Sequence, residues 1–387
     1  MTHHPQGNTE DSMNSRLTQR NALRNGATRR PGPRILGLAT SIAFSLPLFL
    51  TAIGCSDDDK PTSPTAETDF APVLTDFAEH VVVGTYDDLA ASAARLVARA
   101  EELEQDPTQA RLDAVATAWL ETRAPWESSE AFLFGPVAFL SIDPSLDSWP
   151  VDRQQLSDVL ASQLELTKDT VAEGLGPALR GFHAAEYLVF QDGLVRDVAE
   201  LTQRELEYLV ATSQVMADDA ALLRDSWTGS YAEQFRRAGQ SGSPYVTQRD
   251  AVLEIVEGMI GICDEVANGK IADPFDEQDT RLVESQFSWN SLTDFQNNIR
   301  SVKNAYTGGY HLGSDGTGLD EFVKEADESL DARVKSEIDA AIAAVGAIPE
   351  PFRNNLDHAS EIEAAQKAID DLRDTLELMV KPLLVSL

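Results

Sequence analysis

The segment GPALRGFHAAEYLVFQDG, residues 176–193, combines an apolar helical pattern with two ionisable side chains, His183 and Glu186. Its spacing predicts one helix over about 177–191. On a helical wheel, Glu186 falls inside the apolar arc that should face the core. A buried carboxylate is costly unless it is paired, hydrogen-bonded, protonated or bound to metal. The G-x-H-x-x-E pattern that starts at Gly181 therefore predicts an internal polar site.

A second stretch, AWLETRAPWESSEAFLFGP at 118–136, repeats this arrangement. Arg123 and Glu130 share a helical face with large apolar side chains, namely Trp119, Trp126 and Phe134. Pro125 is expected to kink or restart this helix. Two separate helices thus carry ionisable groups on faces that should be buried. The simplest arrangement is that these faces meet and form one polar pocket.

Three interpretations of that pocket remain open from the residues alone. It is a buried ion-pair network in which Arg123 neutralises Glu130 or Glu186, a metal site, or the active site of a metallopeptidase. Histidine and glutamate at positions i and i+3 can bind one ion, and mixed imidazole and carboxylate ligands suit iron, zinc or manganese. Further ligands would have to come from nearby acids, and the candidates are Glu127, Glu130, Asp147 and Asp152.

Hydrolytic signatures are weak. The chain has no H-E-x-x-H motif, and H-x-x-E-H fails because Tyr187 follows Glu186. Neither a G-x-S-x-G elbow nor a G-x-x-x-x-G-K phosphate loop occurs. Serine hydrolysis and nucleotide hydrolysis of these types therefore have no support.

The first 54 residues resemble a bacterial lipoprotein signal peptide. Residues 1–34 contain six arginines, residues 35–53 are apolar, and the sequence TAIGC ends at Cys55. We expect cleavage before Cys55, lipid on its sulfur as the anchor, and a flexible tether over 55–70. An ordinary membrane-spanning helix is the alternative. Translation starts at Met1 or at Met13.

The formal net charge of the whole chain is −33 at pH 7. Removal of an arginine-rich leader would make the mature protein still more acidic. Such a charge argues against binding to nucleic acid, where phosphate contacts need Lys and Arg. The acidity fits a strongly solvated surface or a field that attracts cations.

Helical periodicity dominates the rest of the sequence and strand signals are nearly absent, so we expect an all-α protein. Asp106 is a candidate N-cap. The Gly/Ser-rich stretch 228–245 divides a helical domain, 71–383, into possible halves 71–228 and 245–383. Helices are expected near 75–104, 153–171, 177–191, 200–225, 246–269, 277–306, 319–346 and 356–380, and a further helix is expected to start near Pro107.

The sequence resembles the imelysin family of bacterial envelope proteins. The likeness is carried by G-x-H-x-x-E at 181–186, RAPWESSEAFLFGPV at 123–137, IDPSLDSWPVD at 142–152 and a later segment at 284–310. These pieces lie in order across most of the chain. The resemblance implies an all-helical fold of two bundle-like halves with a pocket between them. It also implies a place in the periplasm or outer envelope and a link to iron uptake, with an envelope iron-uptake partner.

Transferred residue by residue, the resemblance assigns His183 and Glu186 as metal ligands, for iron or zinc. Other ligand-binding candidates are Arg123, Trp126, Glu130 and Asp152 and, from the later segment, Ser288, Asn290 and Asn298. The first hypothesis is a non-enzymatic lipoprotein that binds a metal ion or a small iron-linked ligand. The alternatives are a metallopeptidase using His183 and Glu186, and a structural or partner-docking protein whose buried charges only specify the fold.

Overall fold

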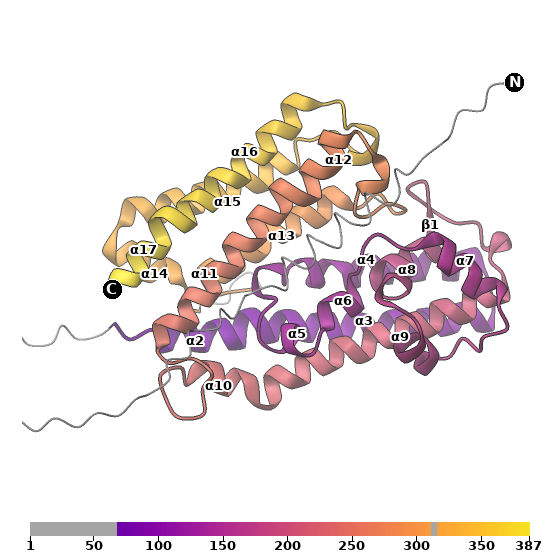
Figure 1. The fold of residues 1–387 in the computed structure, drawn as a ribbon, viewed down its shortest axis with the longest axis horizontal. Coiled ribbons are helices and arrows are strands. Elements are labelled where there is room, and N and C mark those ends of the chain that lie inside the picture. Colours follow the sequence, from indigo (N-terminus) through magenta and orange to yellow (C-terminus); the bar gives the residue numbers. More distant parts are fainter. Residues whose placement is uncertain (1–67, 311–315) are drawn as a thin grey trace, which may run out of the picture. The chain divides into compact units, whose positions relative to one another are not determined.

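The computed structural model describes residues 68–310 and 316–387, most of which are helical (Figure 1). The predicted all-α class is confirmed. Within these residues, β1 (Phe190–Gln191) and β2 (Leu194–Val195) form a small antiparallel hairpin that the sequence did not predict. The predicted signal peptide and the predicted tether up to residue 67 lie outside the described residues. None of the described helices combines the length and the apolar character that a membrane span requires.

The N-terminal bundle is built on three long helices, α3 (Gly84–Gln105), α4 (Gln109–Glu127) and α9 (Gln203–Ser226). Helix α3 packs against both α4 and α9. Helix α9 begins with a capping box, in which the Thr202 hydroxyl accepts from the Glu205 amide at 3.2 Å. Shorter elements complete the bundle: α2 (Ala71–Asp76), η1 (Phe77–Val83), η2 (Glu130–Phe132), α5 (Pro136–Phe139), α6 (Ile142–Leu146), α7 (Arg153–Ala161), η3 (Thr170–Gly174), η4 (Pro177–Leu179), α8 (Gly181–Val189), η5 (Val198–Glu200), η6 (Trp227–Tyr231) and α10 (Ala232–Arg236).

The C-terminal bundle contains α11 (Gln248–Glu265), α13 (Ser291–Thr307), α15 (Glu328–Val345) and α16 (Ala359–Thr375). Helix α15 packs between α13 and α16, and α11 packs against α13 and α16. Cys263 of α11 is buried in this core. The remaining elements are η7 (Val266–Ile271), α12 (Ala272–Glu277), η8 (Thr280–Leu282), α14 (Leu319–Ala326), η9 (Phe352–Asn354), η10 (Leu376–Val380) and α17 (Lys381–Ser386).

The two bundles share one hydrophobic core. Helix α13 contacts α4 and η2, and α11 also contacts η2. The C-terminal end of α4 therefore lies against the C-terminal bundle. The predicted linker 228–245 contains η6 and α10, and a division of the chain at that point stays a prediction.

Several predicted helix boundaries were wrong. Asp106 ends α3 instead of capping α4, because the residue before a proline avoids the helical region; its φ and ψ are −148° and 84°. The helix expected at 153–171 ends at Ala161. The helix expected at 277–306 is broken by an irregular segment, residues 283–290, which precedes α13. We refer to it as the 283–290 loop, and it forms part of the site described below.

Candidate metal centre

Gly181 determines where α8 begins and thereby where His183 lies. Its φ of +77° is a left-handed conformation that residues with a side chain rarely adopt. A Cβ at this position would lie 2.2 Å from the backbone oxygen of Leu146. Glycine therefore lets α8 start directly against the end of α6, next to Asp147. Nearly all of α8 is buried, including His183, 1% exposed, and Glu186, 0% exposed.

Glu186 is held by the 283–290 loop of the C-terminal bundle. Its Oε1 accepts hydrogen bonds from the Phe287 amide at 3.0 Å, the Ser288 amide at 2.8 Å and the Ser288 hydroxyl at 2.7 Å. Its Oε2 lies 3.1 Å from Nδ1 of His183. Both oxygens therefore already have donors, which makes Glu186 better suited to orient His183 than to bind a metal.

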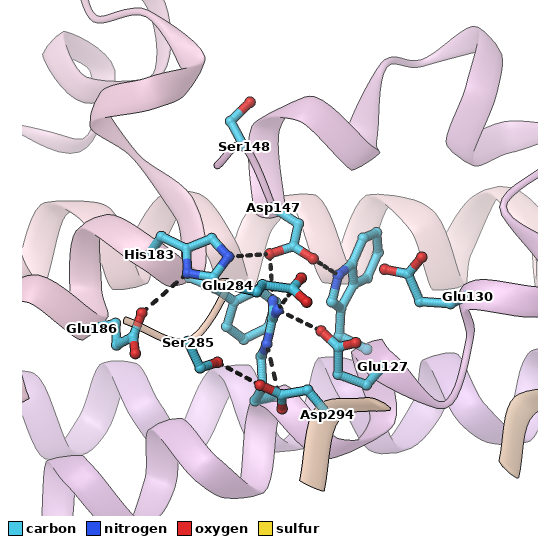
Figure 2. Close-up of polar contacts among 12 residues, drawn as sticks. Glu127, Glu130, Asp147, Ser148, His183, Glu186, Glu284, Ser285 and Asp294 are labelled. Carbon is cyan, nitrogen blue, oxygen red and sulfur yellow. Dashed lines mark hydrogen bonds and ion pairs between the residues drawn. The ribbon is translucent and has the colours of Figure 1, made fainter. Parts of the chain in front are cut away.

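His183 lies between two carboxylates, those of Glu186 and Asp147 (Figure 2). Since a carboxylate only accepts, Nδ1 carries the proton that is shared with Glu186. On the other side, Nε2 lies 3.1 Å from Oδ1 of Asp147, without the alignment of a full hydrogen bond. Burial lowers the pKa of His183, but its contacts with Asp147 and Glu186 outweigh burial and raise this pKa to about 9.

Arg123 is the central cation of the cluster. It projects from α4, which continues through Pro125 to Glu127, and its side chain is fully buried. Burial alone would lower the pKa of Arg123, but the surrounding carboxylates hold it well above its usual value. Its guanidinium contacts four of them: Glu127 at 2.6 Å, Glu284 at 3.0 Å, Asp294 at 3.8 Å and Asp147 through Nη1.

Lys270 of η7 is the second buried cation, and the C-terminal bundle provides it. Its ammonium lies 3.1 Å from Glu284, 3.5 Å from Glu127 and 3.9 Å from Glu130. Burial would lower the pKa of Lys270, but these acids raise it well above its usual value. Lys270 thus links Glu130 to the acids around Arg123.

Neutral side chains orient several of the acids. Trp126 Nε1 donates to Oδ2 of Asp147 at 2.7 Å. Asn290 Nδ2 donates to Asp294 at 2.7 Å, and Asn298 Nδ2 donates to Glu127 at 2.5 Å. The structure therefore brings most of the sequence-predicted site residues into one cluster, in which all but the half-buried Ser288 and Asn290 are buried: Arg123, Trp126, Glu130, His183, Glu186, Ser288 and Asn290, together with Asn298.

Asp152 is the exception among the predicted ligand-binding residues. It is the N-cap of α7, where Oδ1 accepts from the Gln155 amide at 2.9 Å and Oδ2 from Gln155 Nε2 at 2.6 Å. These local bonds direct its carboxylate to the helix terminus and away from the cluster.

Two surface hollows of about 360 and 370 Å³ lie away from the cluster, along α3, α9 and residues 166–169, and neither contains a site residue.

The cluster has an excess of negative charge. Two cations, Arg123 and Lys270, face six carboxylates, those of Glu127, Glu130, Asp147, Glu186, Glu284 and Asp294. With all acids ionised and His183 neutral, four negative charges would be uncompensated in a dry environment. Burial raises the pKa of Glu127 to about 8 and that of Asp294 to about 6, while Arg123 only partly opposes it. The excess must be neutralised by bound protons or by a further cation.

Three side chains could share such a cation. Ligand atoms of Asp147, His183 and Glu284 lie within 4.8 Å of one another. The same holds for a second group, which consists of Glu127, Glu130 and Asp147. Glu284 Oε2 is buried and accepts no hydrogen bond from the described residues. One imidazole nitrogen and two carboxylates form a donor set that suits iron, zinc or manganese. The residues present therefore fit a divalent metal ion.

Sequence reasoning missed Lys270, Glu284 and Asp294. Lys270 lies just beyond the end of a predicted helix, and nothing local distinguishes it from a solvated lysine. Glu284 and Asp294 belong to the later family-like segment 284–310, which was the one available signal. Asp147 was considered only as one of four possible ligands, although it contacts both Arg123 and His183.

The fold and the site together define a class: all-helical proteins of two packed bundles that enclose a histidine and a set of acids. The chain belongs to the imelysin family, since the family model described as Imelysin matches residues 82–379. It is 32% identical over 353 residues to iron-regulated protein A of Synechococcus elongatus, covering 88% of this chain and 95% of that protein.

Solved structures agree with this assignment. A crystal structure of a protein described as an iron-regulated protein A precursor, from Parabacteroides distasonis, has a TM-score of 0.76 and 33% identity, covering 84% of this chain and 98% of that one. An imelysin-like protein from Psychrobacter arcticum has a TM-score of 0.66 at 14% identity, covering 81% of this chain and 94% of that one. The second likeness concerns the fold alone.

Proposed function

We propose that this protein is a lipid-anchored binding protein of the bacterial cell envelope that holds a divalent metal ion, or a small iron-linked ligand, at Asp147, His183 and Glu284. The observation that carries the proposal is the buried Oε2 of Glu284, which accepts no hydrogen bond from the described residues and lies in a cluster whose carboxyl groups outnumber its arginine and lysine side chains. A cation at this point would satisfy that oxygen and reduce the charge excess together.

Each nearby residue then has a distinct role. Asp147, Glu284 and Nε2 of His183 are the metal ligands. Glu186 is a positioning residue, because it accepts from Nδ1 of His183 and so directs Nε2 toward the two acids. The metal itself would supply a compact positive charge that Arg123 and Lys270, on long side chains, cannot supply at the same point.

The link to iron rests on the relatives, two of which carry the name iron-regulated protein A. The cellular location rests on the leader sequence and on Cys55 as the lipid anchor. A protein held at the periplasmic face of a membrane, or at the outer membrane, could pass its ligand to an envelope iron-uptake partner. Palmitate labelling of the protein in cells, lost in Cys55→Ala, tests the anchor.

Metal analysis of the purified protein tests the centre. We expect one equivalent of iron or zinc per chain, which Glu284→Gln and His183→Ala abolish. Glu121→Gln is the matched control, because Glu121 lies on α4 like Arg123 but is 54% exposed and outside the cluster. A wild-type protein that binds no iron, zinc or manganese at micromolar concentrations would overturn the proposal and favour a purely structural ion-pair network.

Peptide hydrolysis is less consistent with this geometry, because the cluster is packed among buried side chains and a peptide bond would have to reach it. Incubation with an unfolded protein substrate separates the two functions. We expect no chelator-sensitive cleavage above the level of Glu186→Gln. Cleavage that depends on both His183 and Glu186 would instead favour the metallopeptidase.

A further inference from the structure

The outer side of the 283–290 loop carries two arginines that converge on one residue, Gln286. Arg153, the first residue of α7, donates through Nη2 to Oε1 of Gln286. Arg353 of η9 donates through Nη1 to the backbone oxygen of Gln286 at 2.5 Å. One guanidinium comes from the N-terminal bundle and the other from the C-terminal bundle, so the pair spans the contact between them.

Aromatic rings of the same loop support both guanidinium groups. The Arg153 guanidinium lies 4.8 Å from the centre of the Phe287 ring, and that of Arg353 lies 5.7 Å from the Trp289 ring. Trp289 has a φ of +64°, an unusual conformation for a bulky residue. Its ring packs on Gly193, where a Cβ would lie 2.3 Å from the ring. The platform beneath Arg353 is therefore closely fixed.

Neither arginine is paired with a carboxylate among the described residues, although the chain is rich in acidic residues. The sequence contains 64 acidic and 31 basic residues, yet among the described residues neither guanidinium forms an ion pair with a carboxylate. Burial, together with the nearby positive charge of Arg153, lowers the pKa of Arg353, and the more distant Asp192 and Glu186 only partly oppose this shift. Arg353 Nε is also buried without an acceptor among the described residues.

Two like charges lie next to each other on the side-chain and backbone oxygens of Gln286, with no carboxylate partner among the described residues, and this arrangement leaves a site for a negative ligand. A guanidinium carries five N–H donors in a planar fork that matches carboxylate and phosphate oxygens. We propose that Arg153 and Arg353 form a binding site for a small oxyanion, a carboxylate or a phosphate, at the surface above the buried cluster.

This site lies next to the support of the metal centre but does not depend on it. Gln286, which both arginines contact, precedes Phe287 and Ser288, whose amides hold Glu186. An anion on the arginine pair would thus contact the loop that orients His183. If the centre binds a metal chelate, this is where anionic groups of the chelate would dock; if it binds no metal, the oxyanion site stands by itself.

Calorimetric titration of the metal-free protein with citrate and, separately, with inorganic phosphate tests the proposal. We expect one anion per chain, at least tenfold weaker binding in Arg153→Gln and in Arg353→Gln, and weaker binding as NaCl increases. Arg99→Gln is the matched control, since Arg99 carries the same charge but is 49% exposed and paired with Glu102 on α3. Tighter binding of citrate than phosphate would identify a carboxylate ligand, and the reverse order a phosphate ligand.

A conservative pair of variants distinguishes recognition from general attraction. Arg153→Lys and Arg353→Lys keep the charge but lose the planar fork, and we expect them to bind the anion several-fold more weakly than wild type. Thermal unfolding of each variant checks that the fold persists. Binding of neither anion at millimolar concentration, or equal binding by wild type and both Gln variants, would overturn the proposal whatever the metal analysis gives.

Discussion

The two sides of the 283–290 loop have opposite charge excesses. On its inner side, Glu284 joins buried acids that outnumber their cations. On its outer side, Gln286 holds two arginines without a carboxylate partner among the described residues. An exposed pair such as Lys367 with Asp371, at 2.5 Å, joins one cation to one acid. Under the two proposals above, uncompensated charge, more than the number of ion pairs, marks the places where this protein binds a ligand.

The largest expected effect comes from removing the central cation of the inner side. Arg123→Met leaves four buried acids without their main partner, and loss of one partner of a buried ion pair costs about 3–5 kcal/mol. Urea unfolding of the metal-free protein at pH 7 measures this free energy. A loss below about 1 kcal/mol would mean that the acids of the inner side are already neutralised by protons, and the contrast between the two sides would weaken.

The next effect tests the backbone that places His183. Gly181→Ala combines a φ of +77° with a Cβ that would lie 2.2 Å from Leu146, so we expect a loss of about 2–4 kcal/mol in unfolding free energy. Gly261→Ala is the matched control, because Gly261 lies in α11 with open space around its Cβ position and should gain up to about 1 kcal/mol. Equal effects of the two substitutions would contradict this account of the motif glycine.

The same positions show what could and could not be predicted from sequence. Helical periodicity was sufficient for the burial of His183 and Glu186, because α8 is a regular helix with a local pattern. Asp152 caps α7 in the structure, and a local signal for that role existed: an Asp followed three residues later by Gln155 is typical of a helix N-cap.

The 283–290 loop could not be predicted in the same way. The apolar residues Phe287 and Trp289 fit a helical continuation toward α13, yet the amides of Phe287 and Ser288 donate to Glu186, about a hundred residues earlier in the chain. That tertiary partner, together with the positive φ of Trp289, holds the segment out of a helix. Lys270 and Glu284 became site residues only through the packing of the two bundles, which no local pattern encodes.

A smaller effect is expected where a residue positions a ligand without binding the metal. Glu186→Gln keeps an oxygen for the Phe287 and Ser288 amides but weakens the bond that orients His183. We expect iron or zinc affinity to fall about 10- to 100-fold, the usual cost of losing an outer partner of a histidine ligand. Competition with a fluorescent chelator measures this affinity. Complete loss of binding, as expected for Glu284→Gln, would mean that Glu186 is itself a ligand.

The smallest effect should be found on the outer side of the loop. Arg153→Gln removes a like charge beside Arg353 and breaks no ion pair within the described part of the chain, so we expect unfolding free energy to change by no more than about 0.5 kcal/mol. Urea unfolding at 50 and 500 mM NaCl tests this, because relief of repulsion between the two arginines would disappear at high salt. A loss of about 2 kcal/mol or more, as for a buried cation, would show that Arg153 holds the two bundles together. The cations on the outer side of the loop would then have the same structural role as those on the inner side, and the two sides would differ only in exposure.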